Sequence, residues 1–170
     1  MRGAFRPISL PNDMTGHNMF IAGEWCDAED GATADIIDPS CNEVIATTPK
    51  ATIADVNRCV TASRAALSNK SWALIDPAER GRILQRMAQA TYANAKALAA
   101  IESQNNGKTF REALSEIRYG AWTLEYFSGL ADKVEGSTIP VPGNRLNYAL
   151  RQPLGGAVHI MRAPFAVKLA

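Results

Sequence analysis

Three helix-start signals follow one another along the middle of the chain, and they constrain the fold more than any other feature. Thr52–Asp55 and Thr109–Glu112 have the spacing of a capping box, in which the two end residues satisfy each other's backbone N–H groups. Asp76–Glu79 combines an N-cap, a proline at the first helical position and an early glutamate. Apolar residues recur at helical spacing behind each signal. The pattern predicts a layer of three helical regions, with a break or new cap at Asn94 in the second.

Glycines and prolines delimit the predicted elements around this layer. Gly107 is expected to end the second helical region in the left-handed conformation, and Gly136 to close the third. A hairpin hinged at Gly23 and strands over 34–38 and 43–48 are expected before the helices. After them we expect a loop over 137–144, a half-buried strand over 145–151 and a fully buried strand over 156–161. These elements predict an α/β fold class.

Composition excludes two classes of partner. The formal net charge is +1 and there is no basic stripe, so neither a nucleic acid nor an anionic membrane is expected to bind. No apolar run approaches the ~18 residues that span a bilayer. The amino terminus has charges but no apolar core behind them, so we expect no secretory signal and a cytoplasmic location. Residues 1–18 are polar and are expected to form a flexible tail.

The chain contains few residues at a spacing typical of catalysis. No dinucleotide-binding, P-loop, zinc-protease or nucleophile-elbow motif occurs. The three cysteines are odd in number and lack metal-ligand spacing, which favours reduced thiols. The pair Gly155-Gly156 fits a turn before a buried strand better than a phosphate-binding loop. Motifs alone therefore predict an α/β domain without a defined activity.

A series of short strings runs through the chain from about residue 18 to about residue 161. They are Phe20–Trp25, Asp38-Pro39 with Glu43–Ala46, Ala78–Arg80 with Ile83-Leu84, Glu102–Lys108, Glu112-Ala113, Glu116-Ile117, Phe127–Ala131 and Arg151–Gly155. In order and spacing, they resemble the amino-terminal third of the NAD(P)-dependent aldehyde dehydrogenase superfamily. The resemblance implies small β elements, a three-helix layer and the start of a cofactor-domain sheet. It makes residues 19–161 a partial amino-terminal domain and residues 162–170 a divergent, truncated end.

The resemblance also implies a reaction, the oxidation of an aldehyde to a carboxylic acid with NAD or NADP. The main chain at Ile160 and Met161 corresponds to family positions that contact the cofactor. Just beyond them the family has an asparagine whose side chain donates to the oxyanion, and here Pro164 occupies that position. Proline offers neither a side-chain amide nor a backbone N–H. Loss of one oxyanion donor typically lowers the rate by about 10²–10³.

Two further sites follow from the resemblance. Some family members bind a monovalent cation, and the corresponding positions are the main chain of Ile36 and Ile37 and the side chain of Asn105, where the family has an acid. The strand from Arg145 to Arg151 corresponds to an arm that pairs with another subunit, which implies a homo- or hetero-oligomer.

The family's nucleophilic cysteine and general-base glutamate correspond to segments beyond residue 170. None of Cys26, Cys41 and Cys59 aligns with the nucleophile, and without a thiolate there is no covalent intermediate and no hydride transfer to NAD. The leading hypothesis is a truncated aldehyde dehydrogenase that is inactive alone and does not bind the cofactor alone. One alternative is a non-catalytic helical module that associates with a full-length relative, and another is one part of a split enzyme.

Overall fold

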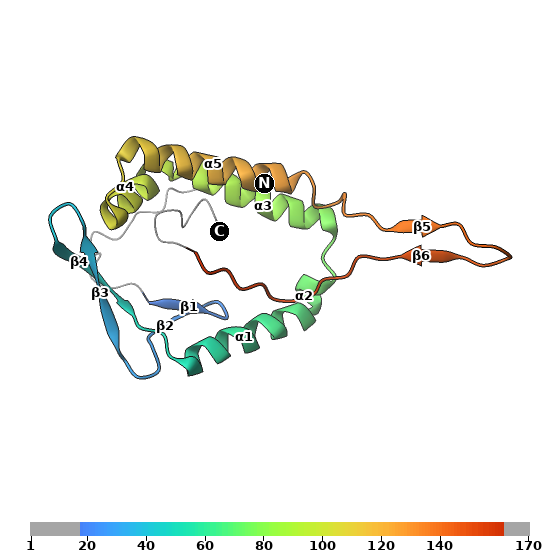
Figure 1. The fold of residues 1–170 in the computed structure, drawn as a ribbon, viewed down its shortest axis with the longest axis horizontal. Coiled ribbons are helices and arrows are strands. Elements are labelled where there is room, and N and C mark those ends of the chain that lie inside the picture. Colours follow the sequence, from blue (N-terminus) through green and yellow to red (C-terminus); the bar gives the residue numbers. More distant parts are fainter. Residues whose placement is uncertain (1–17, 162–170) are drawn as a thin grey trace.

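The computed structural model describes residues 18–161 as a mixture of hairpins and helices (Figure 1). Four strands come first, then five helices, then two strands. Their bounds are β1 Met19–Ile21, β2 Glu24–Cys26, β3 Thr33–Asp38, β4 Glu43–Pro49, α1 Ile53–Ser68, α2 Lys70–Ala73, α3 Pro77–Ala93, α4 Ala95–Asn106, α5 Phe110–Ser128, β5 Ser137–Ile139 and β6 Asn147–Ala149. The predicted α/β class is confirmed. Within the described residues, no helix is long and apolar enough to cross a membrane.

The strands expected before the helices are present, and they pair as two separate antiparallel hairpins, of which the sequence predicts the one at Gly23. β1 pairs with β2 through a turn in which Gly23 has a φ of +92°, a conformation that favours glycine. β3 pairs with β4, and the register shifts between Ile36 and Ile37. The shift leaves one extra residue on β4, which is a β-bulge and bends the strand locally.

The N-terminus of α1 is fixed by the predicted capping box. The Thr52 side chain accepts a hydrogen bond from the Asp55 backbone N–H, and the Asp55 carboxylate accepts one from the Thr52 backbone N–H at 2.9 Å. The carboxylate also accepts from the backbone N–H of Glu29 and pairs with Arg58 at 3.0 Å. These donors, the Thr52 N–H first, hold the pKa of Asp55 below its usual value although burial opposes the shift. A local cap therefore also ties α1 to the turn that precedes β3.

The helical layer is formed by α3, α4 and α5, which pack on one another in Figure 1. The predicted break at Asn94 is confirmed, because this residue is both the C-cap of α3 and the N-cap of α4. The contact between α4 and α5 encloses the best-buried cluster of the described chain. Its members are Ala95, Ala99, Ala113 and Ile117, with Leu98 and Leu114 packed against them.

Two helix boundaries differ from the sequence prediction. The short helix α2 was not expected, and it begins where the Asn69 side chain accepts from the Ser71 backbone N–H. The prediction that Gly136 closes the third helical region is wrong, because α5 ends at Ser128. At this end the Ser128 hydroxyl donates to the Glu125 carbonyl at 2.6 Å. The Gly129 N–H donates to the Tyr126 and Phe127 carbonyls and so leaves the helical bonding pattern.

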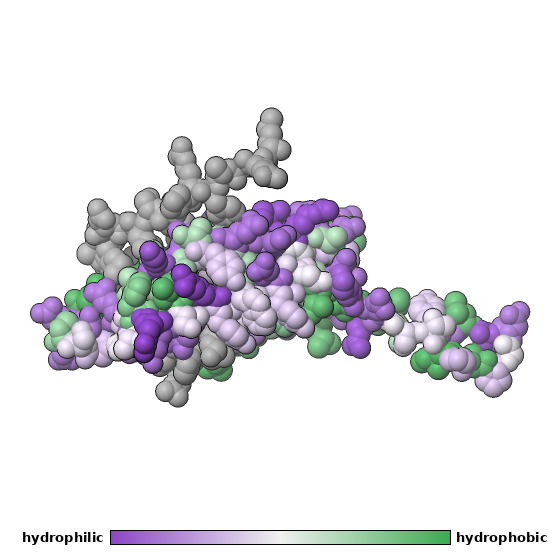
Figure 2. Space-filling model, turned by 90° about the horizontal axis from the view of Figure 1, so that it is seen from above, coloured by the Kyte–Doolittle hydropathy of each residue, from purple (hydrophilic) through white to green (hydrophobic). Residues whose placement is uncertain are grey.

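The strands after the helices form a hairpin that projects from the body of the protein (Figures 1 and 2). Residues 137–144, predicted to be a loop, contain strand β5, and the predicted strand over 145–151 is shorter, because only β6 is paired. Pro140, Pro142 and Gly143 lie in the connection between the strands and do not interrupt the pairing. Side chains of both strands are exposed, and apolar residues line the hairpin in Figure 2.

The predicted buried strand over 156–161 is not formed. Residues 151–161 follow an extended path without strand pairing, and Val158 and Ile160 are 83% and 97% exposed. A strand needs a neighbour to accept its N–H groups and donate to its carbonyls, and no described strand pairs with this segment. The Arg151 guanidinium donates to the Glu135 carbonyl at 3.2 Å, and further along Gly155 lies against Leu67 and Gly156 against Ser63 of α1.

Candidate functional site

The end of β3 packs against the C-terminal end of α4, and this junction is the main candidate site. Gly107 follows α4 with a φ of +76°, the left-handed conformation expected from the sequence. A Cβ added at Gly107 would lie 2.8 Å from the Pro39 side chain, so only glycine allows this close approach. The fold therefore brings together the two elements that carry Ile36 and Ile37 on one side and Asn105 on the other.

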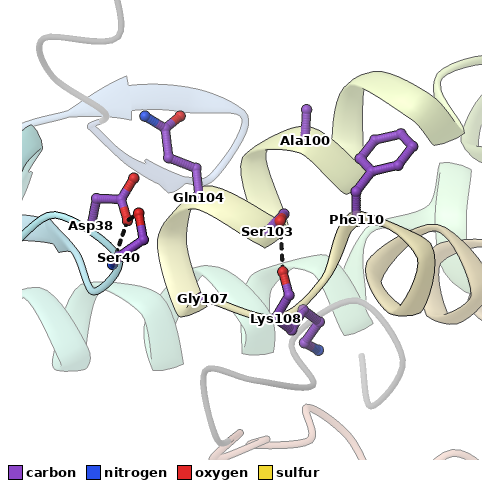
Figure 3. A pocket seen from close by; sticks show the side chains of 8 residues that line it. All are labelled: Asp38, Ser40, Ala100, Ser103, Gln104, Gly107, Lys108 and Phe110. Atoms are coloured by element: carbon purple, nitrogen blue, oxygen red, sulfur yellow. Dashed lines mark hydrogen bonds between the residues drawn. The ribbon is translucent and has the colours of Figure 1, made fainter.

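An open cavity of about 550 Å³ with a mixed polar and apolar lining lies at this junction (Figure 3). Residues from the β3–β4 turn and from both ends of the α4–α5 connection line it. They are Asp38, Ser40, Ala100, Ser103, Gln104, Gly107, Lys108 and Phe110. Figure 3 shows Asp38 and Ser40 on one wall and the turn from Ser103 to Phe110 on the other.

Two polar residues of the cavity lining, Asp38 and Ser103, already form hydrogen bonds within the protein. The Asp38 carboxylate accepts from the Ser40 backbone N–H at 2.8 Å and from the Ser40 hydroxyl at 2.6 Å, and these donors hold the pKa of Asp38 below its usual value. The Ser103 hydroxyl donates to the Lys108 carbonyl at 2.6 Å. All three bonds serve to shape the turns that form the walls.

A cluster of charged side chains, contributed by α4, α5 and the connection between them, holds this connection in place. The Lys108 ammonium, 13% exposed, lies 3.3 Å from the Glu102 carboxylate and also donates to Glu116. Burial alone would lower the pKa of Lys108, but the hydrogen bonds and charges of Glu116 and Glu102 raise it above its usual value. The cluster thus holds a charged lysine in place at neutral pH.

The spacing of its residues in the sequence does not predict this cluster. Lys108 is six residues from Glu102 and eight from Glu116, so neither pair has the three- or four-residue spacing of a helical ion pair. The three side chains meet only because the chain reverses at Gly107. The Gly-Lys string inside the matched segment was the one signal available.

The residues expected at the cofactor lie on the extended segment. Ile160 and Met161 stand at its end, 97% and 40% exposed, and they are not among the residues that line the cavity. Their contact with a cofactor stays a prediction, as does a cation at Ile36, Ile37 and Asn105. Pro164, the residue at the oxyanion position, lies outside the described residues, as do residues 1–17 of the predicted tail.

The described cysteines are dispersed. Cys26 is half-buried in β2, where its sulfur accepts from the Arg58 guanidinium at 3.4 Å, while Cys41 and Cys59 are exposed. Over residues 18–161, no cysteine hydrogen-bonds a histidine or a carboxylate, and no three His, Cys, Asp or Glu side chains gather as a metal site would require. The described residues therefore do not assemble a nucleophile with its base.

Comparison with known proteins assigns this fold. The aldehyde dehydrogenase family model matches residues 25–167. A hydroxyisobutyraldehyde dehydrogenase from Mycolicibacterium austroafricanum is 39% identical over 143 residues, which cover 84% of this chain and 28% of that protein. A cytosolic 10-formyltetrahydrofolate dehydrogenase from Xenopus tropicalis is 36% identical over 152 residues, 85% of this chain and 17% of that protein. The chain belongs to the aldehyde dehydrogenase family.

The structural comparison agrees. The crystal structure of betaine aldehyde dehydrogenase from Staphylococcus aureus, in complex with NAD+, superposes with a TM-score of 0.72 at 32% identity. The match covers 74% of this chain and 25% of the crystallised one. The chain thus spans about a quarter or less of these relatives, and the resemblance seen in the sequence is confirmed.

Proposed function

We propose that this chain contributes the amino-terminal part of an NAD(P)-dependent aldehyde dehydrogenase and does not oxidise aldehydes by itself. The family match over residues 25–167 carries the proposal. The described residues supply helices and hairpins but no cysteine with a base beside it. A relative from Staphylococcus aureus was crystallised with NAD+, which supports a nicotinamide cofactor for the complete enzyme. We extend to this chain the cytosolic location that the Xenopus relative's name states.

An assay of the purified chain tests the catalytic part of this proposal. The chain is incubated with NAD or NADP and a broad panel of aldehydes, and cofactor reduction is followed by absorbance. We expect no rate above that of buffer, because hydride transfer in this family follows attack by a thiolate that no cysteine here is placed to supply. A complete family enzyme, assayed alongside, shows that the conditions support turnover. A clear rate that disappears in a Cys26→Ser variant would overturn the proposal.

We infer three more specific roles within the same proposal. Ile160 and Met161 would contact the cofactor through the main chain, and Pro164 would stand where the family places its oxyanion-binding asparagine. A monovalent cation would be held by carbonyl oxygens of Ile36 and Ile37 and by the Asn105 amide oxygen. Oxygen ligands suit such a hard cation, and the neutral amide of Asn105 supplies no charge to hold it. The β4 bulge opposite Ile36 and Ile37 and the contact between β3 and α4 support this placement.

The projecting hairpin supports a second role, association with another polypeptide. Among residues 18–161, β5 and β6 pair only with each other, which leaves one edge of each without a described partner, and Ile139, Leu146, Tyr148 and Leu150 are between 46% and 77% exposed. Free edges and apolar side chains are what a second chain can pair with and cover. This role fits an oligomerisation arm and also a non-catalytic module that binds a full-length relative.

Co-expression with a full-length family member tests this association. We expect the two proteins to elute together in size-exclusion chromatography. A Tyr148→Asp change should prevent co-elution, because it places a charge in the apolar face of the hairpin. Glu135→Asp, a conservative change at an exposed position before the hairpin, serves as the control. A chain that never elutes with its relative would rule out the association.

A further inference from the structure

The α4–α5 connection contains a dipeptide with its own reactivity. Asn106-Gly107 is the one Asn-Gly pair in the 170-residue sequence. In such a pair the glycine nitrogen can attack the asparagine side-chain carbonyl carbon, forming a C–N bond and expelling ammonia to leave a cyclic imide. Water then opens the imide to aspartate or isoaspartate. Glycine favours the attack because it has no side chain to obstruct it and adopts many backbone conformations.

In the folded chain every group needed for this reaction is engaged. The Gly107 N–H donates to the Ser103 carbonyl at 2.9 Å, in the last bond of α4. The Asn106 amide nitrogen donates to Glu102 at 2.9 Å, and its amide oxygen accepts from the Lys108 backbone N–H at 3.0 Å. The attacking nitrogen is thus held in a helical bond, and the amide it would attack is held from both sides.

The same contacts determine what the product would do. Deamidation replaces the amide that donates to Glu102 with a carboxylate, so two negative oxygens would face each other where a 2.9 Å hydrogen bond now lies. The charged cluster beside Asn106 already contains two carboxylates, those of Glu102 and Glu116, and one ammonium, that of Lys108. A further negative charge there is repelled more strongly than it would be at an exposed site, because these side chains are largely shielded from water. An isoaspartate would also lengthen the backbone within the turn.

We propose that Asn106 is a deamidation site that the folded α4–α5 connection keeps unreactive and that local opening of this connection activates. Each opening exposes the amide and frees the glycine nitrogen. Once the carboxylate forms, the connection does not close in its original geometry. The fraction of chains deamidated at Asn106 therefore rises with each opening of the helical layer and does not fall again.

Peptide mapping of the full chain by mass spectrometry tests the proposal. The chain is incubated in mildly alkaline buffer with and without concentrated urea, and replacement of the amide NH2 by OH is followed at each asparagine. We expect conversion at Asn106 to be at least about tenfold slower in the folded chain than in urea, since opening must precede reaction. Asn105, followed by asparagine and not glycine, is the internal control and should convert much more slowly in urea. Equal rates for Asn106 in both conditions, or for both residues in urea, would overturn the proposal.

Variants that loosen the α4–α5 connection distinguish protection of Asn106 by the fold from the intrinsic reactivity of the Asn-Gly pair. Ser103→Ala removes the hydroxyl bond to the Lys108 carbonyl, and Lys108→Met removes the central charge of the cluster. Both leave the Asn-Gly pair intact, so conversion in urea should be unchanged while conversion in buffer rises severalfold. If Lys108→Met unfolds the chain, its rate in buffer should equal its rate in urea, which the proposal also requires. Unchanged rates in buffer for both variants would show that the connection does not gate the reaction.

The product can be imitated directly. Asn106→Asp should lower the urea midpoint of unfolding, while Asn105→Asp adds the same charge one residue earlier at an exposed position and should lower it less. Equal midpoints for the two variants would contradict the structural consequence that we assign to the modification.

Discussion

Replacing Ile117 by alanine is expected to lower the free energy of unfolding by about 3 kcal/mol, within the ~2–5 kcal/mol typical of such core truncations. The Ile117 side chain is fully buried between α4 and α5. Three of its buried neighbours, Ala95, Ala99 and Ala113, are alanines, whose short side chains cannot move to fill the space left behind. The loss of stability should therefore include most of the free energy that an unfilled cavity costs, in addition to the lost burial of the side chain.

Urea denaturation followed by far-ultraviolet circular dichroism measures this effect, with the slope of the transition as a check on two-state unfolding. The matched control is Ile53→Ala, the same change at an exposed helical position, where the side chain is 83% exposed. The control should change the stability by less than about 0.5 kcal/mol. Similar losses in the two variants would mean that the α4–α5 contact is not the stabilising core of the helical layer.

Replacing Gly81 by alanine is expected to destabilise the chain even though alanine is the better helix former. Alanine should gain about 0.5–1 kcal/mol in a helix interior. However, a Cβ at Gly81 would lie 2.5 Å from the Ser128 carbonyl oxygen, a backbone atom that cannot rotate away. Separating α3 from the end of α5 to admit the methyl group should cost about 1–3 kcal/mol. The steric cost exceeds the gain in propensity, so we expect a net loss.

The matched control is Gly129→Ala. Gly129 already has a right-handed φ of −76°, and its added Cβ would meet the nearest atom at an ordinary 3.6 Å. This variant should be neutral or slightly stabilised in the same urea titration. A stabilised Gly81→Ala would show that α3 and α5 separate at no cost, contrary to the packing described above.

Features governed by neighbouring residues could be predicted from the sequence. The Thr52–Asp55 and Thr109–Glu112 caps, the new start at Asn94 and the left-handed Gly107 each depend on contacts within a few residues. The end of α5 could not be predicted from periodicity, because apolar spacing continues through Leu130 while the Gly129 N–H already donates to the Tyr126 carbonyl and leaves the helical bonding pattern.

Features that depend on distant partners were predicted poorly. The apolar composition of residues 156–161 indicates a buried strand, but a strand also requires a neighbour, and no described residues provide one. The charged cluster at Lys108 depends on a chain reversal that brings α4 and α5 together. For the candidate site, the family resemblance selected Ile36, Ile37 and Asn105, and the structure brings the elements that carry them into contact. The Pro39–Gly107 contact that joins these elements could not be predicted from spacing.

The pairing of the strands has a consequence for how the protein acquires its structure. Every described sheet is a hairpin of two consecutive strands, and α4 and α5 are consecutive helices, whereas the contact of α3 with α5 joins residues far apart in the chain, such as Gly81 and Ser128. Contacts between residues near in sequence form quickly, because little chain entropy is lost when they meet. The described hairpins and the α4–α5 pair can therefore form soon after their residues emerge from the ribosome, and the contact of α3 with α5 follows only once α5 has emerged.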